Sequence, residues 1–290
     1  MIKSGFVAIV GKSNVGKSTL LNKFIGQKIS IVTSKKQTTR NAIQGIYNDD
    51  ECQIVFIDTP GIHKAKSELG EMMDKASYSS IRDCDLALFV VDSSHEVDEG
   101  DQYLFDHLKF DCPVIVVFNK IDETNIDLIT KLKEQYIEKY HPIAFIETVA
   151  TEGFNVNELL ELIKKNLEEG PRYYDVETVT DATISFRVQE IIREKMLVLL
   201  KDEVPHSSAV ICQNIDYDEV PCQIYVKVIV EKESQKGIVI GSKGKMIKKI
   251  GTRARHDIEY MLGRHVNLDI TVQVVENWRN SSSFLVKKWY

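Results

Sequence analysis

Along residues 1–167, short apolar runs alternate with stretches in which apolar residues recur at helical spacing. This alternation predicts a doubly wound α/β domain with a mostly parallel sheet, in which ligands bind at the carboxyl ends of the strands. The predicted strands are 6–10, 42–47, 53–57, 86–91, 114–118 and 143–147. The predicted helices are 17–25, 67–81, 98–108, 127–139 and 155–167.

A different pattern follows residue 170. A Gly-Pro pair at 170–171 indicates the end of the first domain (1–170) and the start of a linker (171–181). The second domain, 182–290, is then predicted to be an α+β module with its own sheet. Its elements are a helix at 182–200, strands at 209–217, 223–231 and 268–275, and a helix–turn–helix centred on 241–244.

Length and composition agree with two ordinary globular domains. The chain has 290 residues, of which 43% are hydrophobic and 28% charged. No apolar run is long enough to cross a bilayer, and the N-terminus leads straight into the first predicted strand. Five scattered cysteines without metal-ligand spacing predict a reducing, cytoplasmic setting.

The net charge of −6 hides an asymmetry between the two domains. Residues 181–290 hold 17 Lys and Arg against 14 Asp and Glu, whereas residues 1–180 hold 20 against 29. Within the second domain, the stretch 236–256 contains seven basic residues and no acid. Such a block is either a solvated helix face or a surface that binds a polyanion.

The segment Gly11–Ser18 reads G-x-x-x-x-G-K-S and lies between a predicted strand and a predicted helix. Two glycines let backbone N–H groups turn toward phosphate oxygens, and the helix N-terminus adds partial positive charge. Lys17 is predicted to reach the β- and γ-phosphates, and Ser18 to hold Mg²⁺. The alternative is a glycine turn with an incidental lysine.

Two further loops follow predicted strands. In Asp58-Thr59-Pro60-Gly61, the carboxylate suits an outer-shell Mg²⁺ contact and the Gly61 N–H suits the γ-phosphate, although a plain Pro-Gly turn would look alike. In Asn119-Lys120-Ile121-Asp122, the Asp122 carboxylate can accept from two guanine N–H groups, a pairing that adenine cannot offer. The ligand is therefore predicted to be GTP, with Asn119 tying the loops together and the stem of Lys120 covering the base.

The polar segment 34–41 contains Thr38-Thr39-Arg40. A threonine here could join the Mg²⁺ shell only while the γ-phosphate is present, which would make the segment a switch. Thr39 is the preferred candidate, and the alternative is an exposed loop.

These motifs, in this order, resemble the translation-factor-related GTPases and, within them, the Era family of bacterial ribosome-assembly GTPases. The resemblance rests on Asn14–Asn22, Gln37–Arg40, Asp58–His63 and Asn119–Asp122. It implies a fifth loop, Val149-Ala150-Thr151, whose Ala150 N–H would meet the guanine O6. The implied nucleotide-binding residues are Gly11, Lys12, Ser13, Asn14, Val15, Gly16, Lys17, Ser18, Thr19, Asp58, Thr59, Pro60, Gly61, Ile62, Asn119, Lys120, Asp122, Val149, Ala150 and Thr151.

The resemblance also bears on the chemistry. Ile62 stands where many regulatory GTPases carry the glutamine that orients the attacking water, so intrinsic hydrolysis of GTP is predicted to be slow. Lys17, Thr39 and Gly61 are the implied catalytic residues, and Ser18, Thr39 and Asp58 the implied Mg²⁺ residues. Asn14 resembles an asparagine that coordinates K⁺ in some relatives.

The second domain carries Gly241-Ser242-Lys243-Gly244 inside the acid-free block. Two glycines let a backbone approach a nucleic-acid strand while the surrounding cations neutralise phosphates. The alternative is a helix–turn with solvated lysines. The module resembles a type II KH domain, with predicted RNA contacts from Gly241, Ser242, Lys243, Gly244, Lys245, Lys248, Lys249, Arg253 and Arg255.

The resemblance as a whole implies a slow GTP-hydrolysing switch that binds the 3′ region of 16S ribosomal RNA and assists assembly of the 30S subunit. It implies GTP or GDP with Mg²⁺ as ligands, no DNA partner, a monomer, and a cytoplasmic location with weak peripheral association with the inner face of the membrane. Two other hypotheses stay open at this stage. One is an RNA-binding scaffold for which GTP is only a conformational ligand, and the other is a membrane-surface signalling GTPase.

Overall fold

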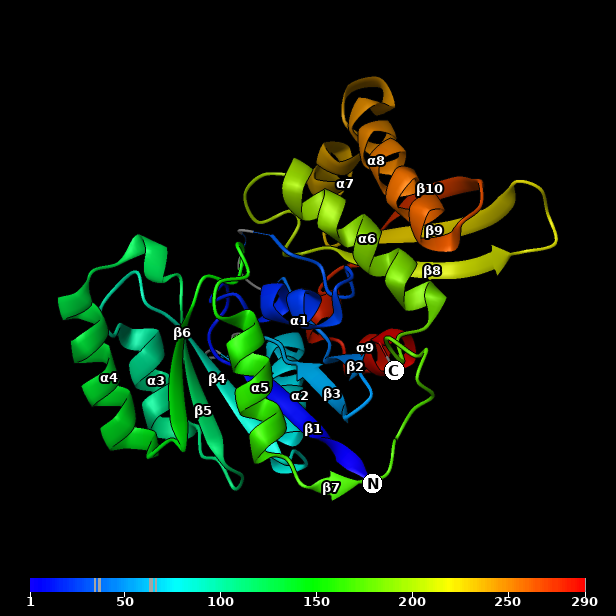
Figure 1. The fold of residues 1–290 in the computed structure, drawn as a ribbon. Helices are drawn as coiled ribbons and strands as arrows, with labels where there is room; N and C mark the ends of the chain where they lie inside the picture. Colours follow the sequence, from blue (N-terminus) through cyan, green and yellow to red (C-terminus); the bar gives the residue numbers. More distant parts are fainter. Residues whose placement is uncertain (34, 36–37, 63–64, 66, 290) are drawn as a thin grey trace. The chain divides into compact units, whose positions relative to one another are not determined.

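The computed structural model describes residues 1–33, 35, 38–62, 65 and 67–289 (Figure 1). The chain divides into two compact units. The first comprises Met1–Lys66 and Gly70–Asp181, and the second comprises Ala182–Tyr290 together with Ser67–Leu69. Each unit has its own sheet, as the change of pattern along the sequence predicts.

The first unit is built on a mostly parallel sheet in the order β2-β3-β1-β4-β5-β6, so the predicted doubly wound fold is confirmed. Three of its strands are buried along their whole length, which explains why they read as continuous apolar runs. The parallel strands are β1 (Ile2–Val10), β3 (Cys52–Asp58), β4 (Leu86–Asp92), β5 (Val114–Asn119) and β6 (Ala144–Thr148), with β2 (Ile43–Asn48) antiparallel at the edge.

Helices cover both faces of this sheet (Figure 1). One face packs against α2 (Glu68–Arg82), α3 (Glu99–His107) and α4 (Ile126–Tyr140), through a core that includes Phe89 and Tyr136. The other face packs against α1 (Lys17–Ile25) and α5 (Val156–Asn166). The parallel direction of the strands brings the loops after β1, β3, β5 and β6 to one edge, where the sequence motifs meet.

The stretch 171–181, predicted as a linker, is built into the first unit. It is preceded by an unpredicted two-residue strand, β7 (Glu169–Gly170), which pairs with β1. The buried Gln53 amide accepts from the N–H groups of Tyr173 and Tyr174 and donates to the Tyr174 carbonyl. Further along, the Ile46 N–H donates to Val179 O at 2.9 Å. The edge strand β2 is thereby covered, and the two units divide between Asp181 and Ala182.

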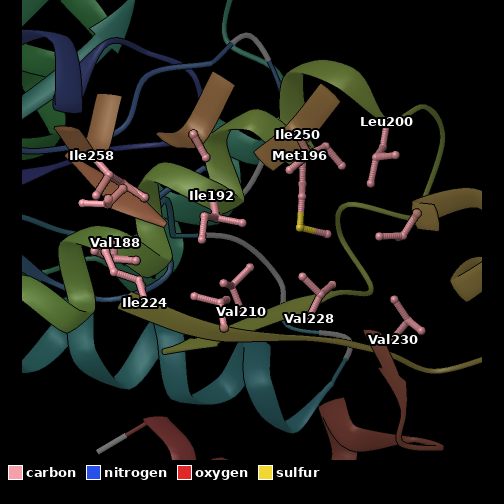
Figure 2. Close-up of a cluster of buried hydrophobic side chains, with 14 of the residues drawn as sticks. Val188, Ile192, Met196, Leu200, Val210, Ile224, Val228, Val230, Ile250 and Ile258 are labelled. Carbon is pink, nitrogen blue, oxygen red and sulfur yellow. The ribbon is translucent and has the colours of Figure 1, made fainter. Parts of the chain in front are cut away.

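The second unit has the helix–strand–strand–helix–helix–strand order of a KH domain, as predicted. Its central strand β9 pairs antiparallel with β8 and parallel with β10. Figure 2 shows the core, in which Val188, Ile192 and Met196 of α6 meet Val210 and Val228 of the sheet. The elements are α6 (Ile184–Leu199), β8 (Ala209–Asp216), β9 (Cys222–Val230), α7 (Glu233–Ile240), α8 (Lys245–Leu262) and β10 (Val266–Val274).

A C-terminal helix, α9 (Ser282–Trp289), was not predicted from the sequence. Before it, the Trp278 ring is fully buried and its Nε1–H donates to Ser207 O at 3.0 Å. The buried ring and its hydrogen bond thus tie the segment before α9 to the loop between α6 and β8. Within the described part of the chain, no helix is long and apolar enough to span a membrane.

Candidate functional site

The loop between β1 and α1 presents the N-terminus of a helix whose N-cap residue, Gly16, has no side chain to cap it. Gly16 lies in the left-handed region at φ 107°, and a Cβ there would stand 2.2 Å from Asn119 Nδ2. The helix has no side-chain cap and no acid in its first turn. Its first N–H groups and its dipole are therefore suited to an anion.

A cleft of about 360 Å³ opens at this helix end. Its walls hold most of the residues predicted from the five motifs as well as Thr38, the alternative to Thr39, and they add Ile31, Val32, Thr33 and Glu123, which were not predicted. The predicted residues on its walls are Ser13, Asn14, Gly16, Lys17, Ser18, Thr19, Thr39, Gly61, Asn119, Lys120, Asp122, Val149, Ala150 and Thr151.

Lys17 is a buried cation at the base of this cleft. Its ammonium donates to Gly11 O at 3.1 Å and to Lys12 O at 2.6 Å. Burial lowers the pKa of Lys17 to about 8, against the opposing attraction of the Asp58 carboxylate. A phosphate group in the cleft would place a negatively charged partner beside this buried ammonium.

Three side-chain oxygens converge beside Lys17. Ser18 Oγ lies 2.6 Å from Asp58 Oδ2 and 2.9 Å from Thr39 Oγ1, and Thr39 Oγ1 lies 3.3 Å from Asp58 Oδ2. Asp58 is fully buried, and its other oxygen, Oδ1, has no hydrogen-bond partner among the described residues. An all-oxygen donor set with a partnerless buried carboxylate oxygen fits Mg²⁺.

Of the two candidate threonines, only Thr39 turns its hydroxyl toward Ser18 and Asp58. The Thr38 hydroxyl instead donates to Lys35 O at 2.6 Å and lies 2.8 Å from Thr33 Oγ1. Two residues of the family resemblance, Gln37 and His63, fall outside the described part of the chain.

Asn119 links three loops. Its Nδ2 donates to Val15 O at 2.7 Å, while its Oδ1 accepts from Thr148 Oγ1 at 3.0 Å and from the Ala150 N–H at 2.9 Å. The predicted tie to the phosphate loop is therefore present in the geometry. The Ala150 N–H, predicted to meet guanine O6, is already engaged with Asn119, so a base carbonyl would have to share it.

Lys120 is held in place by Asp92 at the end of β4. Its ammonium forms an ion pair with Asp92 Oδ2, and its backbone is left-handed at φ 65°. Burial alone would raise the pKa of Asp92, but hydrogen bonds from Lys120 and Ser94 outweigh it and lower the pKa. Asp122 is exposed on the cleft wall, two residues beyond Lys120, where an incoming base could meet its carboxylate.

The Lys12 side chain leaves the cleft, so the predicted nucleotide contact of this residue would have to come from its backbone. Its ammonium lies 2.8 Å from Asp98 Oδ1 and 2.6 Å from Asp101 Oδ2, at the start of α3. The Tyr136 hydroxyl donates to the other oxygen of Asp101 at 2.9 Å. Asp98 and Asp101, with His95, form a group that could hold a metal ion, but the Lys12 ammonium is already paired with both carboxylates. The pair instead anchors the phosphate loop to α3.

Four other predicted nucleotide residues point into the protein. Val15, Thr59 and Ile62 are buried, and the Thr59 hydroxyl donates to Ile9 O at 2.8 Å. The Pro60 carbonyl accepts from the Ser77 hydroxyl at 3.0 Å. These residues shape the loops from behind rather than lining the cleft.

Ile62 packs into the core beneath α2, α3 and α4, so its truncation should act on stability. We expect Ile62→Ala to lower the free energy of unfolding by about 2–5 kcal/mol, and Ile62→Val by about 0.5–1.5 kcal/mol. Denaturant titration checks this, with single-turnover hydrolysis of GTP expected to stay within about twofold per folded molecule. A large fall in the hydrolysis rate constant at unchanged stability would show that Ile62 acts in the chemistry.

The basic turn of the second unit lies between α7 and α8. Gly241 and Gly244 both have positive φ, at 72° and 74°, and Lys243 between them is also left-handed at φ 50°. All the predicted cations here are exposed. At 100° per residue they occupy an arc of about 160° around α8, opposite the buried Ile250, Ala254 and Ile258. They are Lys243 in the turn and Lys245, Lys248, Lys249, Arg253 and Arg255 on the helix.

Comparison with known proteins gives a full-length match. GTPase Era of Clostridium botulinum is 46% identical over 292 residues, covering 100% of this chain and 99% of that protein. The chain belongs to the Era family of GTPases. Within this Era-family chain, residues 6–120 match a family described as 50S ribosome-binding GTPases, and residues 203–279 match the KH domain.

Two solved Era structures are similar to this chain over nearly its whole length. A variant of Aquifex aeolicus Era bound to GDP and AlF4⁻ is 37% identical, with a TM-score of 0.92 and 98% of each chain covered. A second Era structure holds MgGDPNP and nucleotides 1506–1542 of 16S ribosomal RNA. It is also 37% identical, with a TM-score of 0.93, and covers 99% of this chain and 98% of its own.

Proposed function

We propose that this GTPase is a slow switch that binds the 3′ region of small-subunit ribosomal RNA through its KH domain and assists assembly of the 30S subunit. The observation that carries the proposal is the relative that holds a GTP analogue and a 16S ribosomal RNA segment at once and matches this chain from end to end. Two features of this chain support it: the cleft at the start of α1 and the exposed cationic arc at the start of α8.

For the nucleotide cleft, we assign roles to groups in and beside it. Lys17, Thr39 and the Gly61 N–H are the groups we assign to the γ-phosphate region, and the first N–H groups of α1 are suited to the phosphate chain. Ser18, Thr39 and Asp58 would hold Mg²⁺, which when bound supplies positive charge against the phosphate oxygens. At the other end of the cleft, Asp122 would accept from the guanine N–H groups and the stem of Lys120 would cover the base.

Hydrolysis by this site should be slow. The step is attack of water on the γ-phosphate, and catalysis depends on positioning that water as well as on stabilising charge. Ile62 is a buried apolar side chain and cannot orient water. A bound partner, or K⁺ held with the help of Asn14 on the cleft wall, would then supply what the chain lacks.

Single-turnover hydrolysis with and without RNA tests the switch. The 3′-terminal segment of 16S ribosomal RNA should bind at least about tenfold more tightly than the same nucleotides in scrambled order, and should raise the hydrolysis rate constant. If the native segment binds but leaves hydrolysis unchanged, the chain is an RNA-binding scaffold for which GTP is only a ligand. If both RNAs bind alike, the ribosomal target is wrong.

The remaining expectations are the monomeric state, the cytoplasmic location and the weak contact with the inner face of the membrane. They rest on the family resemblance and stay predictions. Sedimentation of the purified chain, with and without vesicles that contain anionic lipid, measures the oligomeric state and the membrane contact in one experiment.

A further inference from the structure

The Asp58 carboxylate accepts a hydrogen bond from Ser30, a serine that lies outside all of the sequence motifs. Its Oδ2 accepts from Ser18 at 2.6 Å, from Ser30 at 2.8 Å and from Thr39 at 3.3 Å. Ser18 and Thr39 are also the hydroxyls that fit Mg²⁺. Ser30 is fully buried and is not among the described residues that line the cleft. Among the described residues, the hydrogen-bond partner of its hydroxyl is the Asp58 carboxylate.

Ser30 is fixed to α1 through a second side chain. Asn22, in the middle of α1, accepts from the N–H groups of Ile29 at 2.8 Å and Ser30 at 2.9 Å, and its Nδ2 donates to Ser30 O at 2.7 Å. Two of these three bonds use backbone groups of Ser30 and the third uses the Ile29 N–H, so the Ser30 hydroxyl is left for Asp58. The same helix that presents its N-terminus to phosphate is thus linked, through Asn22 and Ser30, to the Asp58 carboxylate.

We propose that Ser30 is a positioning residue for Asp58. By holding Oδ2 in every nucleotide state, it keeps the partnerless Oδ1 available to the metal or to a water molecule bound to it. Thr39 differs, because its contact with the metal depends on the γ-phosphate. The inference rests on the Mg²⁺ site proposed above.

Release of fluorescent GDP and of a fluorescent, non-hydrolysable GTP analogue, each measured over a range of free Mg²⁺, tests this role without relying on hydrolysis or RNA. In Ser30→Ala, the Mg²⁺ concentration at half-maximal retention should rise about tenfold for both nucleotides. With excess EDTA, release from the variant and from the parent should agree within about twofold, because only the metal-dependent part of binding is altered.

Three further variants separate this role from simple destabilisation. Thr39→Ala should shift the Mg²⁺ midpoint for the GTP analogue only. Ser80→Ala removes a hydroxyl that donates to Ala76 O within α2, and it should shift neither midpoint. In an Asp58→Ala background, Ser30→Ala should have no additional effect, since Ser30 is argued to act through that carboxylate.

Thermal melting establishes that each variant is folded. If Ser30→Ala unfolds, Ser30→Cys replaces it, because a thiol is close to a hydroxyl in volume but is a weaker hydrogen-bond donor. Unchanged midpoints for both nucleotides would overturn the proposal. A shift confined to the GTP analogue would also overturn it, because Ser30 would then act through the segment that carries Thr39. If the parent protein retains nucleotide equally well at all Mg²⁺ concentrations, the proposed metal site itself is wrong.

Discussion

Exchange of Asp122 for asparagine should lower the affinity for GTP by roughly 10²–10⁴-fold and create affinity for xanthosine triphosphate. The carboxylate would accept from guanine N1–H and from the exocyclic amine, and each hydrogen bond to a charged group contributes about 1.5–3 kcal/mol. In the variant, the amide N–H₂ would face that amine without an acceptor. Xanthine carries a carbonyl at the same position, so the new amide regains both bonds with it.

Competition against a fluorescent nucleotide measures both affinities, and the neighbouring residue offers a matched control. Glu123 is an exposed carboxylate on the wall of the same cleft, one position further along the chain. Glu123→Gln makes the same chemical change and should leave both affinities within about twofold of the parent. Unaltered binding of GTP by Asp122→Asn would end the assignment of guanine to this end of the cleft.

In the KH domain, Lys243→Asp combined with Gly244→Asp should lower the affinity for single-stranded RNA by at least about 100-fold. Carboxylates in the turn repel phosphate and crowd the approach of the backbone. Gly244 is the better site for the change, because a Cβ there would meet no atom of the described residues within 4 Å apart from its chain neighbours, whereas one at Gly241 would lie 2.7 Å from Met246 Cβ. Aspartate also tolerates a left-handed backbone better than most residues.

A second double variant of the same domain carries the same charge change away from the turn. Lys201 is exposed after α6, and Gly263 ends α8 at φ 64° with nothing within 4 Å of an added Cβ. Lys201→Asp with Gly263→Asp should reduce RNA affinity by less than about threefold at physiological salt. Fluorescence anisotropy at one fixed salt concentration compares the pair, after thermal melting shows both to be folded. If the turn variant binds RNA as its control does, the turn is structural and RNA lies elsewhere.

The sequence predicted the architecture well because both domains express their folds locally. Parallel strands buried on both faces read as unbroken apolar runs, and the phosphate loop announces a strand before it and a helix after it. The short strand β7 and the docking of 171–181 were missed. Both depend on partners far away in the chain, such as Gln53, whose buried amide gives no local signal.

For the candidate site, the loops were predicted better than the directions of their side chains. Motif positions identified the loops, but they could not say which side chains face the cleft. Lys12 turns to two acids on α3, and Ile62 turns into the core. Ser30 went unnoticed because a single serine outside a motif carries no pattern; only the distance to Asp58 reveals it.

The uncapped start of α1 has a consequence for the ligand-free protein. A helix end without side-chain acceptors, beside an ammonium buried against two carbonyls, is an incomplete piece of structure. Phosphate oxygens complete it, so folding and nucleotide occupancy are thermodynamically linked. At a nucleotide concentration about 1,000 times the Kd, the linkage stabilises the fold by about 4 kcal/mol, a large share of what a domain normally has. The nucleotide is in this sense the last structural element of the domain.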